Sequence, residues 1–105
     1  MMIAEVIPIM VDRIVKRFSP ASIILFGSQA RGDARKWSDI DLMVIMDKCM
    51  DRRQTAIEIR RLLRDLSVSK DIIVTTRDEI RRKKHIVGTL VHAALRDGRI
   101  LYGRP

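Results

Sequence analysis

Three short apolar runs, separated by longer segments with helical periodicity, constrain the fold of this chain more than any other feature. Residues 22–26, 39–46 and 71–75 are rich in β-branched side chains and are of strand length. Because strands that alternate with helices usually form one sheet covered by those helices, this order predicts an α/β or α+β fold with a single small sheet. A chain of 105 residues has the size of one domain, and we expect residues 1–105 to form it.

The segments between the runs have the spacing of amphipathic helices. A helix is expected over 6–18, with Pro8 in its first turn, where the missing N–H of proline costs nothing. Thr76 and Glu79 form the pattern of a capping box at the start of a basic helix that ends near residue 84. The other expected elements are helices over 53–66 and 85–96, a helical turn at 29–31, and a short edge strand over 99–102.

The composition narrows the range of partners. A net charge of +8 is compatible with nucleic acid, anionic nucleotides or an acidic protein. With only four aromatic residues, a stacking platform for single-stranded nucleic acid is poorly supported, and we expect no direct nucleic-acid binding. A single cysteine excludes an internal disulfide. No apolar run approaches the roughly 20 residues of a membrane span and no signal-peptide pattern opens the chain, so we expect a cytoplasmic location and no membrane partner.

Two carboxylates stand where a strand would normally bury apolar residues. Asp39 and Asp41 are two residues apart, so on a strand both side chains point to one face while Ile40 and Leu42 point to the other. Carboxylates this close repel each other unless a positive charge lies between them. Hard divalent cations such as Mg²⁺ supply that charge and take oxygen ligands, although an isolated D-x-D pattern is more often a solvated strand face.

A glycine and a serine close the strand before this pair. Gly27 would let the backbone approach a ligand closely, and a helical turn that begins at Ser28 would point free N–H groups at it. Phosphate is the ligand that such a turn favours, whereas the two residues alone would indicate only a turn. If the two strands are neighbours, a phosphate cradle faces a metal pair, an arrangement that fits a nucleoside triphosphate bridged by metal.

A third carboxylate would complete a site for two metal ions. Asp71 is the best candidate because it opens the only other interior strand, although Lys70 precedes it and places it near the strand start. Asp65 and Asp78 lie on or beside the expected helices and fit less well.

The string GSQARGDARKWSDIDL, residues 27–42, resembles a known family. Gly27-Ser28, ten intervening residues and Asp39-Ile40-Asp41 match the signature of the DNA polymerase beta-like nucleotidyltransferases. The length of the chain is similar to that of the minimal nucleotidyltransferases, the small free-standing members of this superfamily. The resemblance implies the nucleotidyltransferase fold, a small mixed sheet of about three to four strands flanked by helices.

On the nucleotide side, the resemblance implies contacts with the triphosphate of ATP, the expected substrate. Gly27 and Ser28 would bind the phosphates. Arg31 matches an arginine common in the small members, and contact with phosphate and a bracing ion pair within its loop are both open roles for it.

On the metal side, the resemblance implies two Mg²⁺ ions held by carboxylates. Asp39 and Asp41 would ligate both ions. Asp71 would ligate the catalytic ion and help to deprotonate the acceptor hydroxyl. These three aspartates are therefore the expected catalytic residues.

The acceptor site is expected to come from another polypeptide or from another copy of this chain, because the chain has little room for an acceptor-binding module. The resemblance implies an antitoxin that acts beside a helical HEPN-type toxin encoded nearby and transfers AMP from ATP to a tyrosine hydroxyl of that partner, within a homo- or hetero-oligomer. An alternative is a non-catalytic, nucleotide-binding antitoxin that neutralises its partner by complex formation. A nucleic-acid-binding module is suggested only by the charge.

Overall fold

A four-stranded mixed sheet forms the centre of the computed structural model, which describes residues 3–31 and 39–105. The strands lie in the order β3-β2-β1-β4. β2 pairs parallel with β3 and antiparallel with β1, and β4 pairs antiparallel with the other side of β1. This sheet confirms the predicted fold class, and its strands are β1 (Ser22–Phe26), β2 (Ile40–Met46), β3 (Lys70–Thr76) and β4 (Arg99–Gly103).

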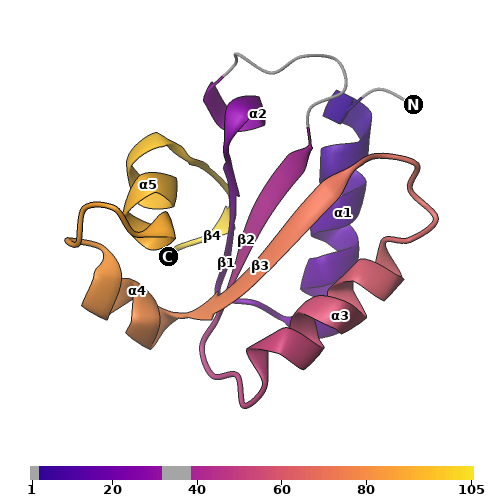
Figure 1. The fold of residues 1–105 in the computed structure, drawn as a ribbon. Helices are drawn as coiled ribbons and strands as arrows, with labels where there is room; N and C mark the ends of the chain where they lie inside the picture. The colour runs from indigo at the N-terminus through magenta and orange to yellow at the C-terminus, as the bar shows by residue number, and fades with distance from the viewer. Residues whose placement is uncertain (1–2, 32–38) are drawn as a thin grey trace.

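Helices cover both faces of the sheet (Figure 1). α1 and α3 lie against one face, α4 and α5 lie against the other, and α2 is a single turn at the end of β1. In the part of the chain that the structure describes, no helix combines the length and the apolar character that a membrane crossing requires. The helices are α1 (Ile3–Phe18), α2 (Ser28–Arg31), α3 (Arg52–Leu62), α4 (Arg77–Lys83) and α5 (Leu90–Asp97).

The alternation of side chains along each strand divides the core into two clusters. On the α1/α3 face, every other strand residue packs against buried residues of the two long helices; these are Val6, Met10, Ile14, Ile23, Leu25, Ile40, Leu42, Val44, Ala56, Ile59, Leu63, Leu66, Ile72 and Val74. The α4/α5 face carries a smaller cluster, formed by Ile24, Met43, Ile45, Ile80, Val91 and Ala94. The α1/α3 face therefore holds most of the buried apolar side chains, and the α4/α5 face is only partly covered.

The position of β3 corrects one expectation from the sequence. Asp71 was expected on an interior strand, but β3 is an edge strand that pairs only with β2 among the described strands. The two interior places are taken by β1 and β2, because β4 pairs with the free side of β1. Asp71 consequently lies at a border of the sheet, with one side of its strand open.

Two helix starts also differ from the expected ones. α1 begins at Ile3, so Pro8 lies beyond the first turn, and the carbonyl of Ala4 loses its usual donor; Ala4 is exposed, so water can replace that donor. α5 begins at Leu90 instead of residue 85, because Gly88 adopts a φ of +95° that interrupts the helical spacing. Thr89 then caps the new start by accepting a hydrogen bond from the N–H of His92.

Candidate active site at the end of β1 and the starts of β2 and β3

The end of β1 lies against the carboxylate of Asp41. Phe26 is the register partner of Asp41 in the antiparallel β1–β2 pair, and Gly27 follows it with a φ of +73°. This left-handed conformation strains a residue that carries a Cβ, and a Cβ built on Gly27 would overlap Oδ2 of Asp41. A side chain at this position would therefore strain the β1–α2 turn and displace the Asp41 carboxylate.

Parallel pairing of β2 with β3 brings Asp41 and Asp71 side by side. The two aspartates are register partners, so their side chains leave neighbouring strands on the same face, the one that α4 and α5 partly cover. Neighbouring strands lie only about 4.8 Å apart, although 30 residues separate the two aspartates in the sequence. Asp39 lies directly before β2 and is exposed. The structure thus gathers Gly27, Asp41 and Asp71 at one end of the strands, with Asp39 adjacent.

An arginine that the sequence did not single out contacts the third carboxylate. Arg60 of α3 lies 3.7 Å from Oδ1 of Asp71 through Nη2, and the same nitrogen donates a hydrogen bond to the carbonyl of Ile72 at 3.3 Å. α3 packs on the opposite face of the sheet, so this side chain reaches around the open edge of β3. Both partners are about half exposed, which makes the ion pair weak and easily replaced by another cation. In the sequence, Arg60 faces away from the apolar stripe of its helix, and this position predicted only a solvated side chain.

The donor set at this end of the sheet fits Mg²⁺. Among the described residues, no group of three or more His, Cys, Asp or Glu side chains is arranged to hold a metal ion. Mg²⁺ does not require such a cage, because it is commonly bound by one or two carboxylates together with phosphate oxygens of a substrate. Asp41 and Asp71, aligned on neighbouring strands, supply the two carboxylates that this mode of binding requires.

Two of the predicted site residues are described by their backbone alone. Ser28 and Arg31 form the first and last residues of α2, as the expected helical turn requires, but their side chains lie outside the described residues. Residues 32–38, in the spacer between the glycine and the aspartates, lie wholly outside the described residues. α2 comprises only four residues, so its dipole is small and the approach of Gly27 to Asp41 is the stronger geometric feature.

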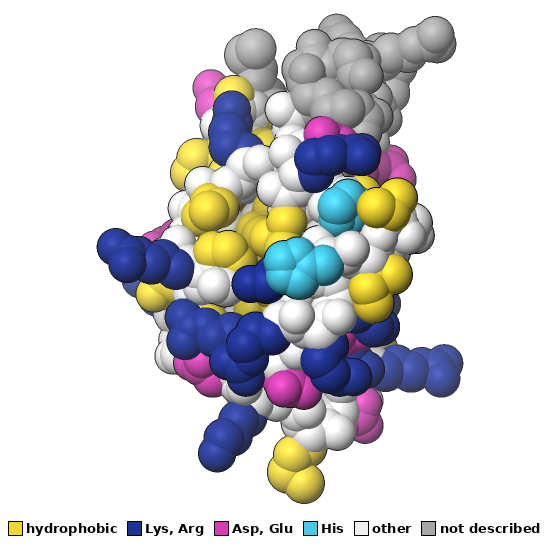
Figure 2. Space-filling view, turned by 90° about the vertical axis from the view of Figure 1, so that its left-hand side faces the viewer, with side chains coloured by type: hydrophobic (Ala, Val, Ile, Leu, Met, Phe, Trp, Pro, Cys, Tyr) yellow, Lys and Arg dark blue, Asp and Glu magenta, His cyan; other side chains and the backbone are white. Residues whose placement is uncertain are grey.

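A hollow of about 160 Å³ continues the α4/α5 face away from the acidic pair. Met43 and Ile73 line it, each two residues further along its strand than Asp41 and Asp71 and therefore on the same face. Leu90 and Val91 of α5 line the opposite wall. Figure 2 shows apolar side chains in the middle of this face, with lysine and arginine side chains around them.

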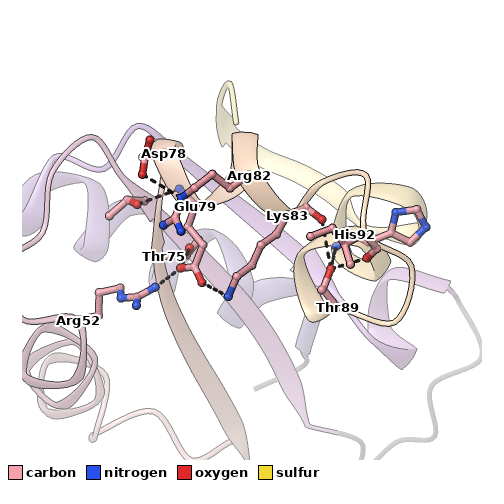
Figure 3. Close-up of polar contacts among 10 residues, drawn as sticks. Arg52, Thr75, Asp78, Glu79, Arg82, Lys83, Thr89 and His92 are labelled. Atoms are coloured by element: carbon pink, nitrogen blue, oxygen red, sulfur yellow. Dashed lines mark hydrogen bonds and ion pairs between the residues drawn. The ribbon is translucent and has the colours of Figure 1, made fainter.

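A buried carboxylate, Glu79, lies at the far side of this hollow (Figure 3). Its Oε2 accepts a hydrogen bond of 2.6 Å from the hydroxyl of Thr75 and pairs with Arg52, and its Oε1 accepts a 2.6 Å hydrogen bond from Nζ of Lys83. The capping box predicted for α4 is only half formed, because Thr76 accepts from the N–H of Glu79 while the Glu79 side chain turns inward. No spacing in the sequence connects Glu79 with Arg52, which comes from α3.

A family model described as a nucleotidyltransferase domain matches residues 7–96. The chain belongs to this family. Membership confirms the resemblance carried by residues 27–42. The chain is also similar to a candidate protein adenylyltransferase of Methanocaldococcus jannaschii, with 51% identity over 45 residues, which are 43% of this chain and 29% of that protein. The match thus spans less than a third of the length of this curated relative.

Solved structures share the fold. A candidate nucleotidyltransferase from Sulfolobus solfataricus superposes with a TM-score of 0.67 at 23% identity, over 95% of this chain and 79% of that chain. A toxin–antitoxin complex with AMP-PNP gives a TM-score of 0.61 at 24% identity, over 96% and 73% of the two chains. The MntA-HpeT toxin–antitoxin gives 0.63 at 20% identity, with 96% and 73% covered. At these identities the likeness concerns the fold, and it confirms the nucleotidyltransferase fold.

Proposed function

We propose that this nucleotidyltransferase domain uses Mg²⁺ to transfer AMP from ATP to a tyrosine hydroxyl of a HEPN-type toxin encoded nearby, and thereby acts as its antitoxin. The observation that supports this most is the alignment of Asp41 with Asp71 on neighbouring strands. They lie beside Gly27, where a Cβ would overlap the Asp41 carboxylate. Relatives described as a protein adenylyltransferase and as toxin–antitoxin complexes, one of them with AMP-PNP, support the substrate and the partner.

The reaction is a displacement at the α-phosphorus of ATP. The tyrosine oxygen forms a bond to this phosphorus, the bond to the β-phosphate oxygen breaks, and pyrophosphate leaves. Asp71 takes the phenolic proton, directly or through one water, because its half-exposed carboxylate lies at the open edge of the sheet. Gly27 and Ser28 hold the phosphates, and Arg31 is positioned in the same turn.

The carboxylates Asp39, Asp41 and Asp71 would hold the two Mg²⁺ ions together with the phosphates. Bound Mg²⁺ supplies neutralisation of the charge that develops on the attacking and leaving oxygens. Before Mg²⁺ and ATP bind, Arg60 is the cation beside Asp71. This weak contact breaks when Mg²⁺ and ATP bind.

A mass measurement tests the proposal. The chain is incubated with ATP, Mg²⁺ and the purified product of the neighbouring gene, and the partner is then weighed. Asp41→Asn is expected to lower the rate of AMP addition at least about 100-fold, because it weakens metal binding that is worth several kcal/mol in the transition state. The matched control is Asp12→Asn, an exposed aspartate of α1 outside the site, which should retain the full rate.

Absence of any mass gain on a partner that binds the wild-type chain would contradict the proposal. Full activity of Asp41→Asn would contradict the metal assignment. Melting temperatures of both variants, measured in parallel, separate loss of chemistry from loss of folding.

The contact between Arg60 and Asp71 favours a second candidate function, namely a nucleotide-binding antitoxin without turnover. If Arg60 stays in contact with Asp71, its guanidinium occupies the carboxylate oxygen that would otherwise face the acceptor hydroxyl. In that case ATP would bind without product, and inhibition of the toxin would survive Asp39→Ala. Inhibition that depends on Asp39 and on transfer of AMP with release of pyrophosphate would exclude this alternative.

A further inference from the structure

A groove of about 430 Å³ runs between the C-terminal part of α3 and the start of β3, on the border of the sheet where Asp71 lies. Two of its lining side chains are apolar and the others are basic. They are Ile57, Val68, Arg60, Arg61, Arg64 and Lys70. No carboxylate is among these residues.

The positive charge of this groove is poorly neutralised. Among the described residues, only one ion pair involves a side chain that lines the groove, the 3.7 Å contact of Arg60 with Asp71. Lys70 donates hydrogen bonds to two backbone carbonyls of the α3–β3 connection, at 2.8 and 2.9 Å, which fix its position and leave its charge in place. Elsewhere on the surface carboxylates accompany many basic side chains, in the pairs Arg13–Asp65, Lys16–Asp12, Arg77–Asp47, Arg82–Asp78 and Arg96–Asp97.

The order of the strands indicates the side from which an acceptor reaches the α-phosphorus. In such a displacement the attacking and leaving oxygens lie roughly in line. With the phosphates held at Gly27, at the end of β1, pyrophosphate leaves on the β1 side and the acceptor hydroxyl arrives on the β3 side. Because β3 is the edge strand, the polypeptide that carries the hydroxyl passes over this edge, where Arg60 joins the groove to Asp71.

We propose that the groove binds an acidic segment of the acceptor protein, adjacent to the hydroxyl that receives AMP, an inference that rests on the proposed function. Four basic side chains around two apolar ones suit a peptide in which carboxylates flank an apolar or aromatic residue. Arg61 and Arg64 supply docking charge, and Arg60 passes from Asp71 to the incoming segment when the site is loaded.

Peptide binding tests the groove without requiring catalysis. The probes are two fluorescein-labelled peptides in which a tyrosine is flanked on both sides by several glutamates or by several lysines. Fluorescence anisotropy with the wild-type chain is expected to show binding of the glutamate peptide and none of the lysine peptide. Charge reversal in Arg61→Glu/Arg64→Glu should weaken binding of the glutamate peptide at least about tenfold. Binding of this peptide to the wild-type chain should depend steeply on salt.

The matched control is Arg17→Glu/Arg99→Glu. These two arginines are exposed, have no ion pair among the described residues, and lie on α1 and on the opposite edge strand β4. Both double variants change the net charge equally, so a loss confined to the groove variant identifies a local site. Equal affinities of the two variants, or equal binding of the two peptides, would overturn the proposal.

Two further measurements separate this inference from the proposed function. If the glutamate peptide binds in the groove but no partner protein gains AMP, the proposed function fails while the groove stands. The other outcome is that the partner gains AMP, with the same KM for the partner in the groove variant and in the control variant. In that case the groove assignment fails while the proposed function stands. Binding of a single-stranded RNA in place of the peptide, lost in the same variant, would assign the groove to nucleic acid and overturn the proposal.

Discussion

The two faces of the sheet differ in what their side chains do. On the α1/α3 face, the strand residues and two long helices form a closed apolar cluster whose largest members are fully buried, including Met10, Ile14 and Ile59. On the α4/α5 face, two short helices leave a hollow, and the strands carry Asp41 and Asp71 beyond the apolar part. The same three strands thus supply packing with one set of side chains and the candidate site with the other.

This difference teaches how a small domain can place charge on interior positions of a strand. Asp41 lies on an interior strand, where a carboxylate lowers stability, and apolar burial on the opposite face offsets that loss. Asp41 alternates with Ile40 and Leu42, both completely buried on the α1/α3 face. We infer that the free energy of folding comes mainly from the α1/α3 face, which leaves the other face free for chemistry.

The largest expected effect compares one isoleucine from each face. Ile59→Ala should cost about 2–5 kcal/mol, at the upper end of that range, because its fully buried site has packed neighbours on all sides. Ile80→Ala, in the smaller cluster beside the hollow, should lie at the lower end. Urea unfolding of both variants gives the two values. Equal losses would break the comparison between the faces.

A smaller effect is expected for the buried carboxylate of the α4/α5 face. Glu79→Gln should cost about 1–3 kcal/mol, because it leaves Arg52 and Lys83 beside a neutral group that is almost completely buried. The neighbouring Asp78→Asn, which removes only exposed pairs, should change stability by about 0.5 kcal/mol or less. Thermal melting checks both variants, and a Glu79→Gln protein as stable as Asp78→Asn would show that the network is dispensable.

Two of the three described glycines with positive φ, Gly27 and Gly88, sharpen the contrast between stability and chemistry. Gly27→Ala and Gly88→Ala both place a Cβ on left-handed backbone, which alone should lower the stability of each variant by about 1–2 kcal/mol. At Gly88 the new atom meets nothing within 4 Å, whereas at Gly27 it overlaps the Asp41 carboxylate. We expect AMP transfer to fall strongly only in Gly27→Ala. Equal activities would separate the turn from the candidate site.

The smallest effect concerns an ion pair that joins α1 to the turn that follows α3. Arg13 donates to Asp65 at 2.6 Å, and this hydrogen bond lowers the pKa of the Asp65 carboxyl from its ordinary value. A lowered folded-state pKa gives stability that is present above the ordinary pKa of about 4 and is lost as the pH falls through the folded-state value. Wild type should therefore melt slightly above Asp65→Asn at neutral pH and equal it in strong acid. A difference that grows in acid would contradict this sign.

The sequence predicted elements well where local chemistry decides them. All three apolar runs became strands within one residue of the expected bounds, because short β-branched runs have few alternatives. The alternation around Ile40 and Leu42 also placed those residues on the face opposite Asp41. Helix bounds were less accurate, since the spacing of apolar residues continues through Gly88 while the backbone there turns the other way.

What the sequence could not predict depends on contacts between distant segments. The edge position of β3 follows from the pairing of β4 with β1, a choice made among all strands at once. The partners of Asp71 and Glu79, Arg60 and Arg52, come from α3 and were indistinguishable from other basic residues of that helix. The local sequence indicated a site through the Gly27-Ser28 and Asp39-Ile40-Asp41 pattern, to which Asp71 was added from its place at the start of a strand.

The parallel register of β2 and β3 makes the candidate site sensitive to insertions in a position-dependent way. One extra residue between Lys70 and Asp71, with Lys70 still opposite Ile40, would move Asp71 to the place of Ile72 on the opposite face and leave the new residue beside Asp41. One extra residue in the connection at 63–69 leaves this register unchanged, because the paired residues of β3 still follow the same order. Length variation among natural relatives of this chain should therefore be tolerated before Lys70 and excluded after it.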